Sequence, residues 1–246
     1  MATPLDLLRL ATALAMLVYA SWRDLESREV SDLVWLIPSL VGVLASAIQY
    51  STGGFNPWTA ALNLAFMALL ATASWWLGLF GGADLLAFLS LAIIHPETPR
   101  LPYLGHPPII FSFTVIANTA LLSATMALYT LARNASAALG GAQIFPGNLS
   151  TPRKAALMLT ALNLPLNQVK GPPFHYPLET PEGVRWRADI FDDEAAAREF
   201  QRLRAQGRER VWVSATLPYL CFITAGYLAS ITLGDILFTA FSALHR

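Results

Sequence analysis

The amino-acid sequence predicts an all-α polytopic membrane protein of about six transmembrane helices, with a small α+β domain inserted between the fifth and the sixth. Two observations lead to this fold class. Hydrophobic residues make up 55% of the 246 residues and charged residues only 13%, whereas a typical soluble domain has roughly 25% charged residues. The charges are also segregated, because residues 33–83 contain no Asp, Glu, Lys or Arg while residues 133–210 hold most of them.

Six stretches are expected to form membrane helices. A helix needs about 20 mainly apolar residues to cross a hydrocarbon layer of about 30 Å, because unpaired backbone groups are costly in lipid. The predicted helices run over Pro4–Trp22, Leu33–Tyr50, Trp58–Phe80, Asp84–His95, Ile109–Ala132 and Val211–Gly234, of which the fourth is short for a full crossing. Residues 1–9 lack the basic start of a secretory signal, so the first stretch is interpreted as a membrane helix rather than a removable signal.

The charged segment 133–210 is expected to be a water-facing domain, which divides the chain into 1–132, 133–210 and 211–246. One helix is predicted to start at Thr151, which would cap it, with Pro152 in the first helical position. A second is predicted to start at Asp192 or Asp193 and to stop at Gly207. Extended pieces are expected around residues 166–170, 174–178 and 184–190.

The distribution of Lys and Arg predicts the orientation of the chain in the membrane. With alternating crossings, the turn after the first helix and the inserted domain hold 13 Lys and Arg residues, against 3 on the opposite side. Cytoplasmic segments carry the excess of basic residues. We therefore expect a multi-pass protein of the plasma membrane whose first turn, glycine-rich junction at Gly81 and inserted domain are cytoplasmic, and whose termini are both external.

Several kinds of site are disfavoured by composition and spacing. The single cysteine, Cys221, provides neither a disulfide framework nor a cysteine-based zinc site. The four histidines are scattered without ligand spacing, so no metal and no cofactor are expected. The formal net charge of zero gives no electrostatic case for nucleic acid, and no Gly-x-Ser-x-Gly motif of a serine hydrolase is present.

Two acids remain as candidates for chemistry. Asp24 is expected in the turn after the first helix and Asp84 at the start of the fourth, so the topology brings both to the cytoplasmic membrane boundary. Two neighbouring carboxylates cannot both ionise cheaply, and one protonated and one charged carboxyl can hydrolyse a peptide bond through a water molecule. Gly81 and Gly82 would let an extended substrate backbone approach Asp84.

Simpler interpretations of the two acids stay open on spacing alone. Asp24 fits equally a solvated turn residue, and Asp84 fits the N-terminal cap of a helix. Asp32 and Asp235, which flank predicted helices, fit interfacial caps better than catalysts. Neither acid would therefore identify an active site by itself.

Three separated stretches resemble the type IV prepilin peptidases, and within them the archaeal preflagellin peptidases. They are Asp24 followed by Arg28 and Val30; the run Gly81-Gly82-Ala83-Asp84; and the closing segment from Val211 to Asp235. The resemblance implies that Asp24 and Asp84 are the catalytic pair of an aspartic endopeptidase, with Gly81, Gly82 and Arg28 as supporting residues. It further implies that the partners are archaellin or type IV pilin precursors, cut at the cytoplasmic face between a short basic leader and a hydrophobic segment.

The sequence departs from the family pattern in two places. Archaeal relatives commonly have a lysine two residues after the second aspartate, where this chain has Leu86, so any role of that lysine in holding the carboxylate is in doubt here. Bacterial relatives often carry paired Cys-x-x-Cys motifs and also methylate the new N-terminus. This chain has neither those pairs nor their loop, which predicts cleavage without methylation.

The first turn offers a hypothesis for leader recognition. Glu26, Glu29 and Asp32 join Asp24 there, and with Arg23 and Arg28 they give a net charge of −2, which would attract a basic leader at short range. The same glutamates fit ordinary solvated charges.

Two other functions also stay open: a small ion-coupled transporter, since intramembrane acids beside glycines mark substrate paths, and a non-catalytic subunit that presents the insert to a partner.

Overall fold

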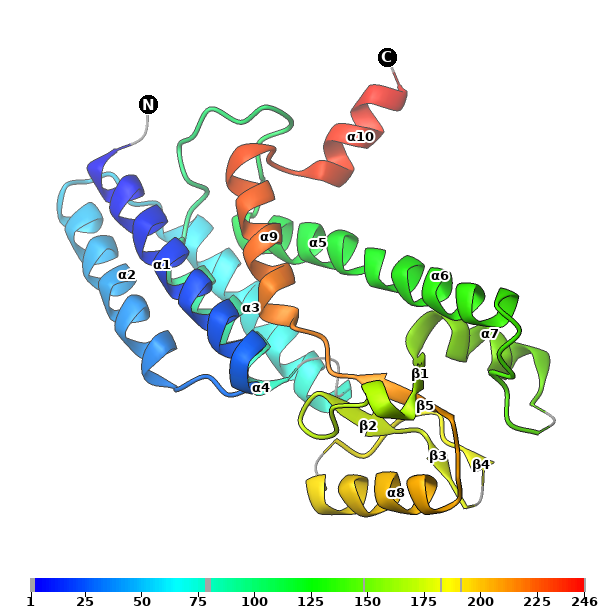
Figure 1. Cartoon of the computed structure of the whole chain (residues 1–246). Coiled ribbons are helices and arrows are strands. Elements are labelled where there is room, and N and C mark those ends of the chain that lie inside the picture. The colour runs from blue at the N-terminus through cyan, green and yellow to red at the C-terminus, as the bar shows by residue number, and fades with distance from the viewer. Residues whose placement is uncertain (1–2, 78–80, 148, 182, 191, 246) are drawn as a thin grey trace. The chain divides into compact units, whose positions relative to one another are not determined.

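The computed structural model describes residues 3–77, 81–147, 149–181, 183–190 and 192–245 (Figure 1). The chain divides into two compact units. Unit 1 comprises Met1–Ser123 and Pro218–Arg246, and unit 2 comprises Ala124–Leu217. Most described residues are helical, and the strands lie within unit 2.

Unit 1 is built from helices. They are α1 (Pro4–Ser27), α2 (Leu33–Ser51), α3 (Pro57–Leu77), α4 (Gly82–Ile94), α5 (Phe111–Ser123), α9 (Tyr219–Thr232) and α10 (Ile236–Leu244). Helix α1 packs against α2, α4 and α9, while α9 packs along α5 and α2 along α4. Buried positions recur every three or four residues on α1, which places one face of that helix in the core. The buried core of this unit includes Leu17, Phe88, Ile223 and Tyr227.

Glycines permit the closest helix approaches in this unit. A Cβ on Gly226 of α9 would lie 2.2 Å from the hydroxyl of Thr119 and 2.8 Å from its backbone nitrogen. A Cβ on Gly42 of α2 would lie 2.7 Å from the Cα of Ile94 at the end of α4. Both pairs bring backbones together as small residues do in membrane helix bundles.

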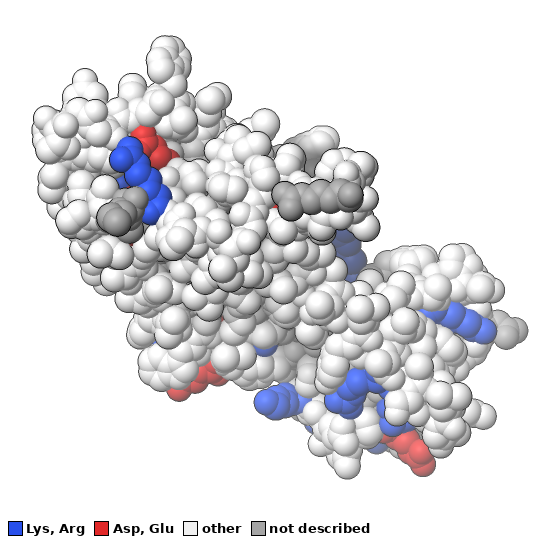
Figure 2. All heavy atoms as spheres, turned by 90° about the horizontal axis from the view of Figure 1, so that it is seen from above, with Lys and Arg blue, Asp and Glu red and all other residues white. Residues whose placement is uncertain are grey.

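The outer surface of unit 1 is apolar. Leu44 of α2 and Leu69 of α3 are 64% and 70% exposed, with many other leucines and isoleucines beside them. Charged side chains occupy only a few places on the face shown in Figure 2. Among the residues that the structure describes, three helical stretches, Pro4–Ser27, Leu33–Ser51 and Phe111–Leu139, are long and apolar enough to cross a membrane, and three shorter apolar helices lie at Pro57–Leu70, Gly82–Ile94 and Tyr219–Thr232. An exposed surface of this kind indicates a membrane protein.

Unit 2 carries a three-stranded antiparallel sheet with order β1-β5-β2. Its elements are α6 (Thr125–Leu139), α7 (Thr151–Thr160), β1 (Leu162–Pro165), a 3₁₀ turn (Leu166–Gln168), β2 (His175–Pro177), β3 (Glu179–Thr180), β4 (Gly183–Val184), α8 (Asp193–Ala205) and β5 (Arg210–Ala215). Asn163 pairs with Trp212, and Tyr176 pairs with Ser214. Strand β5 alternates between two cores: Val211 and Val213 pack with Phe200 of α8, and Trp212 packs on the other side.

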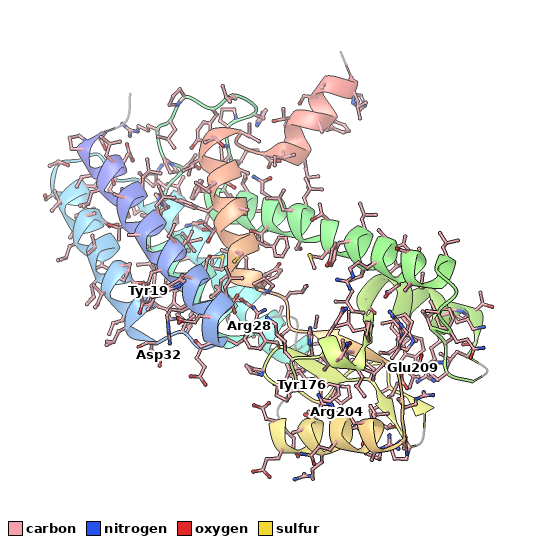
Figure 3. The ribbon with its side chains drawn as sticks, viewed as in Figure 1. Tyr19, Arg28, Asp32, Tyr176, Arg204 and Glu209 are labelled. Carbon is pink, nitrogen blue, oxygen red and sulfur yellow. The ribbon has the colours of Figure 1, made fainter. Side chains whose placement is uncertain are left out.

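Several polar groups buried in unit 2 are paired. Glu179, 5% exposed, accepts hydrogen bonds from the Trp212 amide at 2.9 Å and from Arg208 at 2.6 Å. The Tyr176 hydroxyl, on β2 in Figure 3, donates to Asp193 at 2.6 Å. Desolvation, together with the hydrogen bond and charge of Asp193, raises the pKa of Tyr176 to about 12. This phenol therefore stays protonated across the physiological range.

Several predicted element bounds were wrong. Helix α1 continues past Trp22 to Ser27, because ion pairs between Arg23 and Glu26 and between Asp24 and Arg28 extend it. The predicted helix Ile109–Ala132 is present but starts at Phe111 and extends to Leu139, as α5 and α6 with a break at Ala124. The end expected for the third helix, at Phe80, lies outside the described residues.

The start of the last predicted helix was also wrong, because Val211 and its neighbours form strand β5 and α9 begins only at Tyr219. Alternating Val, Trp and Val suit a strand buried on both faces, and Pro218 precedes the helix. Residues 166–168 form a 3₁₀ turn instead of a strand, and of the predicted extended piece 184–190 only Val184 belongs to one. Helix α10 was not foreseen; Asp235 caps it through the Phe238 amide at 2.8 Å, which fits the cap role expected for this acid.

The approach of α9 to α5 predicts a stability effect. Gly226→Ala places a methyl group where Thr119 already lies, so we expect a loss of about 1–3 kcal/mol, the usual cost of overpacking a core. Thermal unfolding in detergent measures it. Gly54→Ala is the control, since its new Cβ would meet nothing closer than 3.6 Å. Equal melting temperatures for the two variants would contradict the packing argument.

Candidate active site at the ends of α1 and α4

Asp24 lies in the last turn of α1 and is held by Arg28. Arg28 Nη1 contacts Asp24 Oδ1 at 3.2 Å, and the two side chains are only 15% and 13% exposed. Arg28 ends the helix with φ 61° and ψ 15°, a left-handed conformation that is uncommon for residues other than glycine, and its amide donates to the Asp24 carbonyl at 3.3 Å. The backbone turn and the ion pair thus fix the same two residues. Figure 3 shows Arg28 at this end of α1.

The two carboxylate oxygens of Asp24 have different surroundings. Asp24 Oδ2 is buried and has no hydrogen-bond partner among the described residues. A buried carboxylate oxygen without a partner is costly, so it is expected only where something binds it. This atom is therefore available to a substrate group or to water.

Asp84 lies in the first turn of α4, and Gly81 positions it. The Gly81 amide donates to Asp84 Oδ2 at 3.3 Å, which is the return half of a capping box. A Cβ on Gly81 would lie 3.2 Å from the same oxygen, so a larger residue would press on the carboxylate. Gly82 is exposed and has open space where a Cβ would stand. The two glycines leave one side of Asp84 uncovered.

The fold brings the two acids together from distant parts of the sequence. Helices α1 and α4 are in contact, and the C-terminal end of one meets the N-terminal end of the other. The charge of Asp24 acts on Asp84 through space, so the carboxyl groups lie within electrostatic range of each other. Among the described residues Arg28 is the cation paired with Asp24, and Asp84 forms no ion pair with any of them. The environments of the two acids therefore differ.

The three other acids of the first turn are exposed and lie apart from this pair. Glu26 is half exposed and forms an ion pair with Arg23 at 2.8 Å. Glu29 is exposed, and Asp32, also exposed, occupies the N-cap position of α2 without a side-chain capping bond. Figure 3 shows Asp32 at this end of α2. They form an acidic rim beside the turn rather than part of the buried site.

Leu86 points away from Asp84. Two residues along an α-helix turn the side chain by about 200°, so positions 84 and 86 face nearly opposite directions. Leu86 lines an apolar groove of about 400 Å³ together with Asp32, Trp35 and Leu36 of α2. A side chain at position 86 therefore faces α2, and the lysine found there in relatives would start from the side of α4 remote from the carboxylate.

The histidines lie elsewhere. His95 is fully buried at the other end of α4, where its ring nitrogen lies 2.9 Å from the Tyr227 hydroxyl. His175 accepts a hydrogen bond from the Lys170 amide in unit 2. Within the described ranges no three His, Cys, Asp or Glu residues are grouped in a way that could hold a metal ion.

Sequence reasoning missed the contribution of α9 to this end of the bundle. The hydroxyls of Ser21 and Thr224 are 2.7 Å apart, and Thr224 also donates to the Leu17 carbonyl at 3.3 Å. These contacts fix the first turns of α9 against the turn of α1 that precedes Asp24. The signal available in the sequence was the polar residue that recurs every three or four positions within the apolar helix α9, which indicates a face packed against another helix.

Two family models match the chain. Residues 11–131, which include both acids, match the type IV leader peptidase family, and residues 153–236 match the archaeal peptidase A24 C-terminus of type II. No curated protein matches the chain. Together the two matches cover most of unit 1 and most of unit 2. The chain therefore belongs to the type IV leader peptidase family and matches its archaeal prepilin and preflagellin peptidase branch.

Proposed function

We propose that this protein is a membrane-embedded aspartic endopeptidase that removes the short basic leader of preflagellin or type IV prepilin-like precursors, with Asp24 and Asp84 as its catalytic pair. The observation that carries the proposal is that the end of α1 and the start of α4 place two carboxyl groups within electrostatic range of each other and in unequal environments. Membership of a leader peptidase family supports the same activity.

The ion pair assigns different roles to the two acids. Arg28 places its positive charge 3.2 Å from Asp24 Oδ1, whereas among the described residues no ion pair holds Asp84. Asp24 then acts as the base that takes a proton from the attacking water, and its unpaired Oδ2 is the atom that receives it. Asp84 carries the other proton and hydrogen-bonds the scissile carbonyl oxygen. Proton transfer to the leaving amine completes peptide hydrolysis.

The glycines suit an extended substrate. A backbone passing over Gly81 and Gly82 meets no Cβ, so its carbonyl group can approach Asp84 closely. The hydrophobic segment of a precursor would then remain in the lipid while its leader stays in water. Hydrolysis at the boundary between the two fits acids placed at helix ends.

We further propose six crossings with the active end and unit 2 in the cytoplasm and both termini outside. Support comes from three long and three short apolar helices, and from the excess of Lys and Arg in the first turn and in residues 133–210. Without the paired cysteines of bacterial relatives, we propose that cleavage is not followed by methylation of the new N-terminus.

The catalytic pair predicts that neither acid can be replaced by its amide. Asp24→Asn and Asp84→Asn keep the size of the side chain but remove the ionisable group, so the rate should fall by at least about 100-fold. The measurement is cleavage of a preflagellin-type substrate by the purified protein in detergent, with Asp189→Asn, which changes an exposed acid of unit 2, as the matched control. Full activity in either catalytic variant would refute the pair, provided that thermal melting shows all proteins folded.

The contact of Arg28 with Asp24 predicts a separable effect on position. Arg28→Asn keeps a residue that tolerates the left-handed turn but removes the side chain that holds Asp24 Oδ1, so the carboxylate is less well oriented and cleavage should slow about tenfold. Arg23→Gln is the control, because it removes an arginine whose partner, Glu26, is exposed. Equal rates for both variants would count against the assigned roles.

We propose that the acidic rim of Glu26, Glu29 and Asp32 attracts the basic leader. Precursors whose leader lysines are replaced by glutamine should be cleaved more slowly at low salt, and the difference should shrink as salt screens the charges. Initial rates for paired substrates at two ionic strengths measure this. Rates that are equal at low salt would show that the glutamates are only solvated charges.

A further inference from the structure

An apolar groove lies between helices α2 and α4, near the end of the bundle that carries Asp24 and Asp84. The groove has a volume of about 400 Å³ and is lined by one stripe of residues on each helix. Each stripe recurs every three or four residues and so follows one face of its helix. The stripes include Asp32, Leu36 and Ser39 on α2, and Leu86, Ser90 and Ile93 on α4. This surface is named the α2–α4 groove.

The two helices touch just beyond the inner end of the groove. A Cβ on Gly42 of α2 would lie 2.7 Å from the Cα of Ile94 and 3.0 Å from the carbonyl oxygen of Ile93. Gly42 is three residues beyond Ser39, hence about one turn further along α2. The groove therefore occupies the space between this close contact and the starts of the two helices.

The α2–α4 groove has buried residues at its base and exposed residues at its edges. Trp35 and Ser90, which line it, are each 3% exposed, whereas Leu36 and Leu86 are 54% and 36% exposed. Leu36 belongs to the apolar outer surface of unit 1, which is the surface that faces lipid in a membrane bundle. The groove is thus open to an apolar chain that approaches from the side.

A concave surface of this kind suits an apolar helix. Lipid tails are as apolar as leucine, so a helix gains little from the hydrophobic effect when it leaves lipid for protein. It gains from close packing, and small residues such as Ser39 and Ser90 allow that packing. From Asp32 to Ser39 the groove extends over seven residues, about 10 Å or two helical turns.

The position and charge of the groove favour the precursor as its occupant. Leu86 follows Asp84 by two residues, about 3 Å along α4, so the groove begins next to the proposed active site. The residues that line it are uncharged except Asp32, at the N-cap position of α2 (Figure 3). This carboxylate would attract the basic residues that precede the hydrophobic segment of a precursor and repel an anionic lipid head group.

A substrate chain has an open path from the groove to Asp84. Because positions 84 and 86 face nearly opposite sides of α4, the chain must pass over the start of this helix. Gly82 lies there, with open space where a Cβ would stand. A helix is about 10 Å across, so about three extended residues suffice to cross it.

We propose that the α2–α4 groove holds the first two turns of the hydrophobic segment of the precursor, with the chain extended from there across Gly82 to Asp84. The inference rests on the proposed peptidase function and names the surface that holds the substrate within the membrane. It also gives Leu86 a role, because an apolar side chain at this position completes the wall of the groove nearest the active site.

The first test is photocrosslinking in detergent with a tagged preflagellin-type precursor. Leu36→benzoylphenylalanine should crosslink to the hydrophobic segment, as mapped by mass spectrometry. Ile37→benzoylphenylalanine is the matched control, because Ile37 is 58% exposed, does not line the groove and is turned by about 100° from Leu36. Its yield should be at least about tenfold lower, since a crosslink forms only where the side chain faces the bound segment.

The outcomes of this test separate the possible occupants. Equal yields at the two positions, or a crosslink from position 36 only to lipid or to a second copy of the chain, would overturn the inference while leaving the peptidase function in place. Failure of the wild-type protein to cleave any prepilin-type precursor would instead overturn the proposed function, and this inference with it.

The second test fills the groove. Ser39→Phe should raise KM for the precursor about tenfold with kcat within about twofold of wild type, the pattern of lost substrate binding. Ile37→Phe, which adds the same ring outside the groove, should leave KM unchanged. An unchanged KM in Ser39→Phe that melts like wild type would contradict the proposal. Leu36 is exposed, so the crosslinking test does not depend on whether Ser39→Phe folds.

Discussion

The packing of α1 against its neighbours is the constraint on which the rest of unit 1 depends. Ala13, Leu17 and Ala20 are fully buried on one face of this helix, and the two small residues let α9 and α4 come close. In lipid, helix association gains little from the hydrophobic effect, so close fit and the Ser21–Thr224 hydrogen bond supply much of the attraction. The end of α1, and with it Asp24, is placed by that fit.

Helix ends are where a membrane protein can keep polar groups at low cost. The interior of each helix satisfies its own backbone, whereas terminal amides and carbonyls need other partners. At the candidate site those partners belong to the residues that we propose react: the Asp84 carboxylate caps the amide of Gly81, and the Arg28 amide returns to the Asp24 carbonyl. The residues that satisfy these helix ends are therefore also the residues of the candidate site.

Much of unit 1 was predictable because apolar length and charge segregation are strong signals. The first four helices and the position of Asp84 at a helix start followed from residues 4–95 alone. The pairing of Asp24 with Arg28 could not be predicted in this way. The extent of α1 depends on local ion pairs and on a left-handed turn at Arg28, and no sequence pattern predicts that turn. Leu86 stands where archaeal relatives commonly have a lysine, and the sequence alone left the role of this position open. Helical geometry places the Leu86 side chain on the side of α4 that faces α2.

Other features lay beyond sequence reasoning because tertiary context decides them. The run starting at Val211 is as apolar as a helix, and only its pairing with β1 and β2 makes it a strand. Thr224 carries no motif of its own, and its hydrogen bond with Ser21 arises only because α9 packs against α1. Contacts of this kind join residues more than a hundred positions apart.

The packing of α9 along α5 has a consequence for the history of the fold. Helix α5 ends where unit 2 begins and α9 starts where it ends, and the two are joined by contacts such as the hydrogen bond from Asn118 to Ser230 at 2.9 Å. A bundle held together in this way does not need the intervening polypeptide to keep its shape, and the entropy of closing a loop rises only slowly with loop length. Segments of very different size and structure could therefore have been exchanged at this junction while the helices stayed in place.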